Sequence, residues 1–161
     1  MPKDVTIQVF KFDELSESAK ENARDRWRDG MEFAWRDEAK DSIRAFLGQF
    51  GIKLTEWNVG PYQPFSYRLS EYDNSNFRGM KLRDFERENY PTGYCLDADM
   101  SIEFYDMLKK TGDAMHAFEC AVEAGFIGWR NDMEWQMSDE YIDECLEVNE
   151  YEFTESGKIW R

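Results

Sequence analysis

The chain has little cysteine and histidine and no long apolar run. Its 161 residues include three cysteines and one histidine. An odd, dispersed set of cysteines without a C-x-x-C pair is a poor disulfide framework and a poor zinc site. No stretch approaches the roughly 18 apolar residues typical of a membrane span. Residues 1–4 are not followed by the apolar core of a signal peptide. These absences predict a cytoplasmic protein with reduced thiols and no membrane contact.

Basic residues are scarce relative to acidic ones, at 20 against 34, which gives a net charge of −14. Direct nucleic-acid binding is therefore not expected, because phosphate contacts need Lys and Arg. The aromatic content of 16% excludes an acidic disordered tail. The length predicts a single domain over residues 1–161. Its charge is uneven, since residues 1–93 carry 17 acids and 15 bases whereas residues 94–161 carry 17 acids and 5 bases.

Hydrophobic patterning predicts an α+β fold. Alternating and β-branched runs predict strands over residues 5–12, 52–59, 65–72 and 96–104, and a terminal hairpin over residues 150–160. Stripes of helical period predict helices over residues 16–30, 32–50, 113–124 and 139–148. Ser16 and Ser138 are the expected N-caps, Gly51 is expected at positive φ, and Gly125 is expected to end a helix. We therefore expect one domain in which a mostly antiparallel sheet packs against several helices.

One predicted strand carries a candidate metal site. Asp97, Asp99, Ser101 and Glu103 stand at two-residue spacing, which places them on one face of a strand. Oxygen ligands of this kind suit Mg²⁺ or Ca²⁺, and a metal-dependent enzyme using the three carboxylates is one hypothesis. The alternative is the solvent face of a half-buried strand. An EF-hand loop is excluded by the residues at its sixth and twelfth positions, Ile102 and Leu108.

A second candidate for catalysis is the single histidine. His116 stands four residues before Cys120, so both side chains are expected on one helix face. A Cys–His nucleophile pair would need an orienting third group, and no such motif accompanies it. The sequence also has no phosphate-binding glycine loop, no G-x-S-x-G and no H-E-x-x-H. We therefore predict a protein that is not an enzyme and needs no cofactor.

The predicted helix over residues 139–148 has an acidic stripe opposite an apolar one. Its like-charge pairs at four-residue spacing each cost about 0.2–0.5 kcal/mol if exposed. A local rule broken without evident compensation indicates function, and aromatic side chains near the stripe would add binding energy. The alternative is a solvated face that keeps the protein soluble. The expected partner-binding residues are Asp132, Glu134, Trp135, Asp139, Glu140, Asp143, Glu144, Glu147, Glu150 and Glu152.

Two segments carry a family resemblance. Residues 12–27, FDELSESAKENARDRW, and residues 149–159, NEYEFTESGKI, resemble the opening and closing segments of small acidic proteins of tailed phages and prophages. Some members of that family are loosely labelled as the antitoxin of a toxin–antitoxin stability system. The resemblance implies a phage origin and a bacterial host cytoplasm as the setting. It implies no catalytic residues.

These observations lead to one main functional hypothesis and two rivals. The first is a phage accessory protein that binds and inhibits a host defence or nucleic-acid-processing protein, its acidic surface imitating nucleic acid toward a basic partner. The second is an antitoxin-like binder that neutralises a small toxin. The third is the metal-dependent enzyme with Asp97, Asp99 and Glu103. The oligomeric state is left open between a monomer and a small homo-oligomer.

Overall fold

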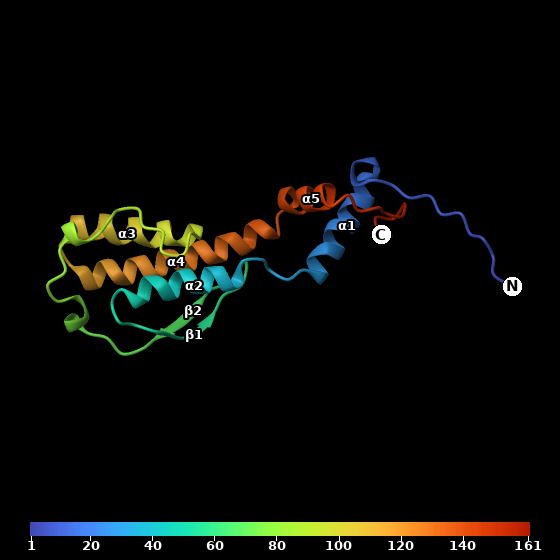
Figure 1. Ribbon diagram of the computed structural model, residues 1–161. Coiled ribbons are helices and arrows are strands. Elements are labelled where there is room, and N and C mark those ends of the chain that lie inside the picture. Colours follow the sequence, from blue (N-terminus) through green and yellow to red (C-terminus); the bar gives the residue numbers. More distant parts are fainter. The chain divides into compact units, whose positions relative to one another are not determined.

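The computed structural model describes residues 1–161, which divide into two compact units (Figure 1). Unit 1 combines Met1–Phe33 with Trp135–Arg161, and unit 2 is Ala34–Glu134. Both helices and an antiparallel sheet are present, so the predicted α+β class is confirmed. The prediction of a single domain is not confirmed, and the sheet has only two strands.

Unit 1 is built on two helices from distant parts of the sequence. Helix α1 spans Glu17–Gly30 and helix α5 spans Asp139–Val148, with a short 3₁₀ turn η1 at Phe12–Glu14. Ser16 accepts a hydrogen bond from the Ala19 N–H, and Ser138 accepts one from the Tyr141 N–H. Both predicted N-caps are therefore confirmed. They could be predicted from sequence because an N-cap bonds to a backbone N–H within one helical turn.

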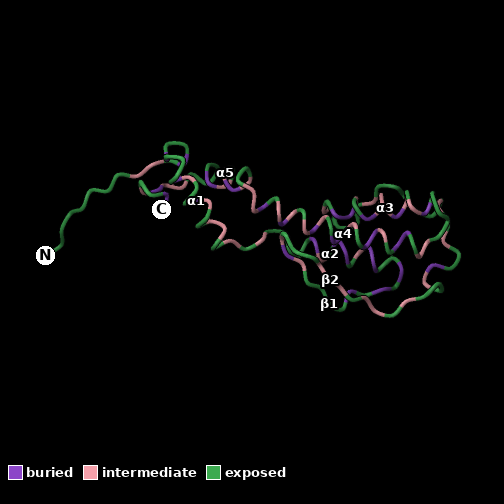
Figure 2. Tube along the Cα trace, turned by 180° about the vertical axis from the view of Figure 1, so that it is seen from behind, coloured by how far each residue is buried: buried purple, intermediate pink, exposed green.

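The core of unit 1 contains side chains from both the N-terminal and the C-terminal segment of the chain. The apolar stripe of α1 packs against that of α5, and the Phe12 and Phe153 rings lie 5.9 Å apart between centroids. The Trp27 ring meets Tyr151 edge-on at 6.1 Å. Figure 2 shows the buried parts of α5 in purple. The buried side chains are Phe12, Leu15, Ala19, Ala23, Ile142, Leu146 and Phe153.

A small bridge network closes unit 1. Phe153 forms antiparallel bridges with both Phe10 and Ile159, so the predicted terminal hairpin is confirmed in outline. Gly157 lies in its turn at a φ of 85°, and a Cβ there would stand 2.0 Å from the Ala19 carbonyl oxygen. The strand predicted over residues 5–12 is wrong, because Phe10 alone is bridged and Phe12 already belongs to η1.

Unit 2 contains one hairpin and three longer helices. The strands β1, Leu54–Asn58, and β2, Ser66–Leu69, lie within the two strands predicted over residues 52–59 and 65–72. They form an antiparallel hairpin with Trp57 opposite Tyr67. Trp35 precedes helix α2 at a φ of 60°, so this helix begins later than predicted. Gly51 has the predicted positive φ, at 70°. The remaining elements are α2 (Arg36–Gly48), η2 (Asn74–Phe77), η3 (Leu82–Asp84), α3 (Cys95–Thr111) and α4 (Ala114–Gln136), whose last two residues belong to unit 1.

The strand predicted over residues 96–104 is wrong, because helix α3 occupies this segment. Leu96, Met100 and Phe104 are buried at four-residue spacing. That spacing satisfies both the alternation of a strand and the repeat of a helix. Ala98 and Ile102, which a strand would place on the same face, are only partly buried, whereas Leu108 continues the four-residue repeat of a helix. The four buried side chains therefore cover one helix face.

The prediction that Gly125 ends a helix is wrong, because α4 continues through Gly125 to Gln136. A Cβ on Gly125 would stand 2.6 Å from the Met100 sulfur, and one on Gly128 would stand 2.7 Å from a Leu96 methyl carbon. These glycines therefore let α4 approach α3 closely. Glycine is chosen here for space between helices and not for chain reversal.

Candidate functional site

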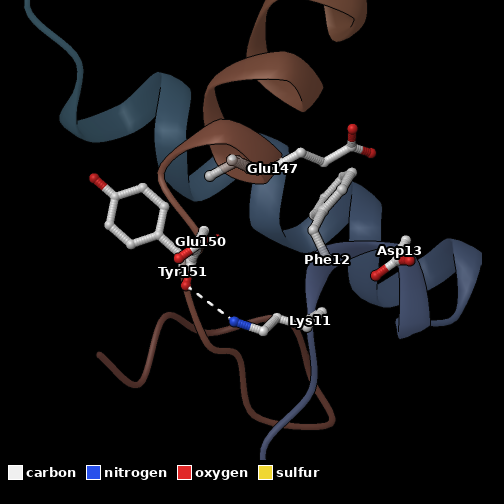
Figure 3. A pocket seen from close by; sticks show the side chains of 7 residues that line it. Lys11, Phe12, Asp13, Glu147, Glu150 and Tyr151 are labelled. Atoms are coloured by element: carbon white, nitrogen blue, oxygen red, sulfur yellow. Dashed lines mark hydrogen bonds between the residues drawn. The ribbon is translucent and has the colours of Figure 1, made fainter.

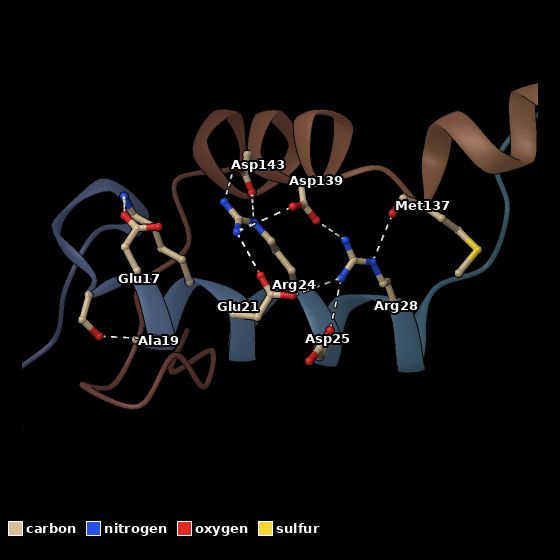
Figure 4. A network of polar contacts seen from close by, with 11 residues as sticks. Glu17, Ala19, Glu21, Arg24, Asp25, Arg28, Met137, Asp139 and Asp143 are labelled. Carbon is tan, nitrogen blue, oxygen red and sulfur yellow. Dashed lines mark hydrogen bonds and ion pairs between the residues drawn. The ribbon is translucent and has the colours of Figure 1, made fainter.

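The acidic helix α5 is bound to α1 by two arginines (Figure 4). Arg24 donates from Nε and Nη2 to the two carboxylate oxygens of Asp143, each over 2.7 Å. Arg28 donates to Asp139 and, over 3.1 Å, to the carbonyl oxygen of Met137. The hydrogen bond with Asp143 raises the pKa of Arg24 above its ordinary value. Asp139 and Asp143 therefore have structural partners within the chain.

This pairing supplies the charge compensation that the sequence did not reveal. Arg24 and Arg28 stand four residues apart on α1, as Asp139 and Asp143 do on α5. Each pair therefore projects from one helix face. The matching spacing was the available signal, but nothing in the sequence identified the two helices as neighbours. The division into residues 1–93 and 94–161 also separates these arginines from the carboxylates that they bind.

Three other carboxylates of α5 have no basic partner. Glu140, Glu144 and Glu147 are exposed, and none of them forms an ion pair within the chain. Their spacing of four and three residues aligns them along one side of the helix. On the opposite side, Ile142 and Leu146 are at most 1% exposed. We call Glu140, Glu144 and Glu147 the acidic ridge.

A pocket of 330 Å³ lies at the C-terminal end of the acidic ridge (Figure 3). Glu147 is part of the acidic ridge and also lines this pocket. The Lys11 ammonium lies 3.5 Å from the carbonyl oxygen of Glu150, whose φ is 54°. The lining contains three carboxylates and one ammonium, so its net negative charge favours a further cation. The lining residues are Lys11, Phe12, Asp13, Leu146, Glu147, Glu150 and Tyr151.

The other predicted partner-binding residues are distributed over both units. In unit 1, Trp135 is 44% exposed beside the Tyr141 ring, and Glu152 is paired with Arg161 over 3.2 Å. Asp132 and Glu134 belong to unit 2. There, Asp132 accepts a hydrogen bond from the Tyr94 hydroxyl over 3.0 Å, and Glu134 accepts one from the Tyr62 N–H over 2.9 Å.

The metal-site hypothesis loses its geometric basis because its strand is a helix. Asp97 is 3% exposed, and its carboxylate accepts hydrogen bonds from the N–H groups of Thr92 and Gly93 and from the Ser42 hydroxyl. Two-residue spacing on a helix turns Asp99 by about 200° from Asp97. No group of three or more His, Cys, Asp or Glu side chains is arranged to hold a metal ion.

The predicted proximity of His116 and Cys120 is confirmed, with 3.7 Å between Nε2 and Sγ. Desolvation, with Glu103 and Glu123 nearby, raises the pKa of the Cys120 thiol. A raised pKa disfavours the thiolate that a nucleophilic cysteine needs. The pair therefore lacks the electrostatic setting of a catalytic dyad.

Comparison of the chain with protein-family models, curated proteins and solved structures gave no match. No helix is both long and apolar enough to cross a membrane. The acidic ridge and the pocket beside it are therefore the features of the molecule that bear on function.

Proposed function

We propose that the chain is a non-enzymatic phage accessory protein that binds a bacterial host protein in the host cytoplasm. In this proposal unit 1 covers a basic surface that the host protein uses for nucleic acid. The supporting observation is the division of α5 into two faces. Asp139 and Asp143 bind arginines of α1, whereas the acidic ridge is exposed without a basic partner.

The acidic ridge suits a surface built for phosphates. At a rise of about 1.5 Å per residue, its three carboxylates are spaced by roughly 6 and 4.5 Å along the helix. Phosphates of one DNA strand are spaced by about 3.4 Å along the axis, so the ridge offers a comparable row of negative charge. Unit 1 as a whole carries 16 acidic and 8 basic side chains. This excess attracts a basic surface at long range and accelerates association.

The orientation of the ridge is fixed before any partner arrives. The bidentate bond of Arg24 to Asp143 and the burial of Ile142 and Leu146 determine the rotation of α5 about its axis. A preorganised surface loses less conformational freedom on binding. The adjoining pocket at Glu147 would accept one Lys or Arg side chain of the partner, because carboxylates and the Tyr151 ring both attract a cation.

The proposal is tested by capture of proteins from bacterial lysate on the immobilised chain. The ridge variant Glu140→Lys/Glu144→Lys/Glu147→Lys is compared with a control that has the same change in charge. The control, Glu38→Lys/Glu71→Lys/Glu86→Lys, alters three exposed carboxylates of unit 2 that form no ion pair. We expect the wild type and the control to retain the same host protein and the ridge variant to lose it.

Short duplex DNA provides the second readout of this experiment. If the ridge covers a nucleic-acid-binding surface, the duplex should displace the chain from its host partner. A partner that is retained by the wild type and control but resists displacement would favour the antitoxin-like alternative. Equal capture by the wild type and the ridge variant would overturn the proposal.

A further inference from the structure

The segment before Phe10 is extended and exposed. None of residues 1–9 forms a backbone hydrogen bond, whereas Phe10 is bridged to Phe153. Val5 is 77% exposed and Ile7 is 43% exposed. The alternation of β-branched residues at positions 5, 7 and 9 is nevertheless that of a strand. The segment thus has the composition of a strand and lacks a second strand to pair with.

The hairpin turn explains why the chain itself cannot supply that partner. Phe10 and Phe153 each donate an N–H to the other's carbonyl oxygen over 2.8 Å, which defines a hydrogen-bonded antiparallel pair. The next such pair would place Gln8 opposite Glu155. Glu155 instead lies within the turn, where the Gly157 N–H donates to the Thr154 carbonyl oxygen over 2.9 Å. The ladder therefore stops at Phe10.

The outer edge of this segment remains open. In a strand, the N–H and C=O groups of alternate residues point to the same edge. Because the backbone groups of Phe10 bond to Phe153, the N–H and C=O groups of Gln8 and Thr6 point to the edge on the side of the hairpin. The groups of Val5, Ile7 and Val9 then point to the opposite edge, where the structure has no neighbouring strand. An unpaired edge of this kind is a template for another strand.

We propose that residues 5–9 of a second copy of the chain pair antiparallel along this open edge. A two-fold axis through Ile7 places Ile7 opposite Ile7 and Val5 opposite Val9. Both copies then satisfy the same donors and acceptors, so the interface closes on itself as a dimer. Each copy adds its bridged Phe10 and Phe153 at the outer side, which extends the ribbon into a sheet.

The charge distribution favours contact between two copies at residues 5–9 over contact between other faces of unit 1. Residues 5–12 contain no carboxylate and one lysine. The rest of unit 1 is strongly acidic, so other faces of two copies repel each other. Cross-strand pairs of β-branched residues stabilise a sheet. The paired segment is short, which predicts a weak and concentration-dependent dimer.

The test measures the oligomeric state of the full-length protein by sedimentation over a range of concentrations. Ile7→Pro removes an N–H that points to the open edge, and two such bonds are lost per dimer. We expect the dissociation constant of the dimer to rise at least tenfold, as expected for about 1.4 kcal/mol. Thr6→Pro is the matched control, because its N–H points to the other edge. Its effect should be clearly smaller.

Amide hydrogen exchange at residue level gives a second readout. In the dimer the amides of Val5, Ile7 and Val9 should be protected, with protection increasing with concentration, while those of Thr6 and Gln8 exchange rapidly. A chain that stays monomeric at every concentration would overturn the proposal. So would protection of the even-numbered amides, or protection of this segment only when a host protein is added.

Discussion

Arg24 and Asp143, 119 residues apart in sequence, form a two-pronged hydrogen bond with both distances at 2.7 Å. The bond joins α1 to α5 and assigns one face of the acidic helix to folding. The other three carboxylates of α5, the acidic ridge, are exposed and form no ion pair within the chain. The arginines of α1 thus divide the stripe of five carboxylates into two that are paired and three that are not.

Removing the guanidinium of Arg24 should destabilise unit 1. Arg24→Met keeps the aliphatic stem but leaves Asp143 without its partner. Because the Arg24 side chain is only 15% exposed, we expect the free energy of unfolding to fall by about 1–2 kcal/mol. Urea denaturation measures this loss. Arg87→Met is the control, since its pair with Asp106 is exposed and screened by water, and its loss should be smaller. Equal losses would show that the α1–α5 bond contributes nothing specific.

Gly157 should be irreplaceable in the terminal hairpin. Its φ is 85°, and an added Cβ would stand 2.0 Å from the backbone oxygen of Ala19. Gly157→Ala should therefore lower the melting temperature markedly, with a cost of about 2 kcal/mol or more. Gly30→Ala is the matched control in the same unit, because no atom lies within 4 Å of its Cβ position. It should leave stability unchanged or raise it by up to about 1 kcal/mol.

The stability of the protein should depend on alkaline pH through the Tyr72 hydroxyl, which is hydrogen-bonded to Glu119. Desolvation and the hydrogen bond to Glu119, 3.0 Å long, raise the pKa of Tyr72 to about 12. The unfolded chain releases this proton near pH 10, so the folded state binds more protons between about pH 10 and 12. The stabilisation is thus complete below about pH 10 and is lost as pH rises toward 12.

Spectrophotometric titration of tyrosinate in the folded protein tests this. Glu119→Gln removes the neighbouring negative charge and should shift part of the absorbance change to lower pH. Tyr72→Phe should remove that part altogether. A titration curve of Glu119→Gln that superimposes on the wild type would contradict the assignment.

The parts of the fold that depend on neighbouring residues were predictable from sequence. Ser16 and Ser138 cap their helices, and residues 54–69 form a hairpin, because each depends on contacts close in sequence. Helix α3 was not predicted, because Leu96, Met100 and Phe104 fit both periods. The Met100 side chain packs against Gly125 of α4, and such a tertiary contact cannot be read from the spacing within one segment.

The candidate site was predicted in composition but not in arrangement. The acidic stripe of α5 was evident from its spacing, whereas the role of Asp139 and Asp143 depends on arginines more than 100 residues away. The pocket beside Glu147 depends on Lys11 and Tyr151 approaching from opposite ends of the chain. Sequence spacing within one helix contains no information on which distant helix will face it.

Salt should change the two proposed associations in opposite directions. Binding of the acidic ridge to a basic host surface is an attraction between opposite charges, so added salt should weaken it. Pairing of two copies through residues 5–9 brings together two chains of net charge −14. Their repulsion is screened by salt, so the dimer should become tighter as ionic strength rises from about 0.05 to 0.5 M. Sedimentation measures the dimer and surface plasmon resonance measures host binding over the same range. A dimer that dissociates with added salt would show that ion pairs, and not strand pairing, hold it together.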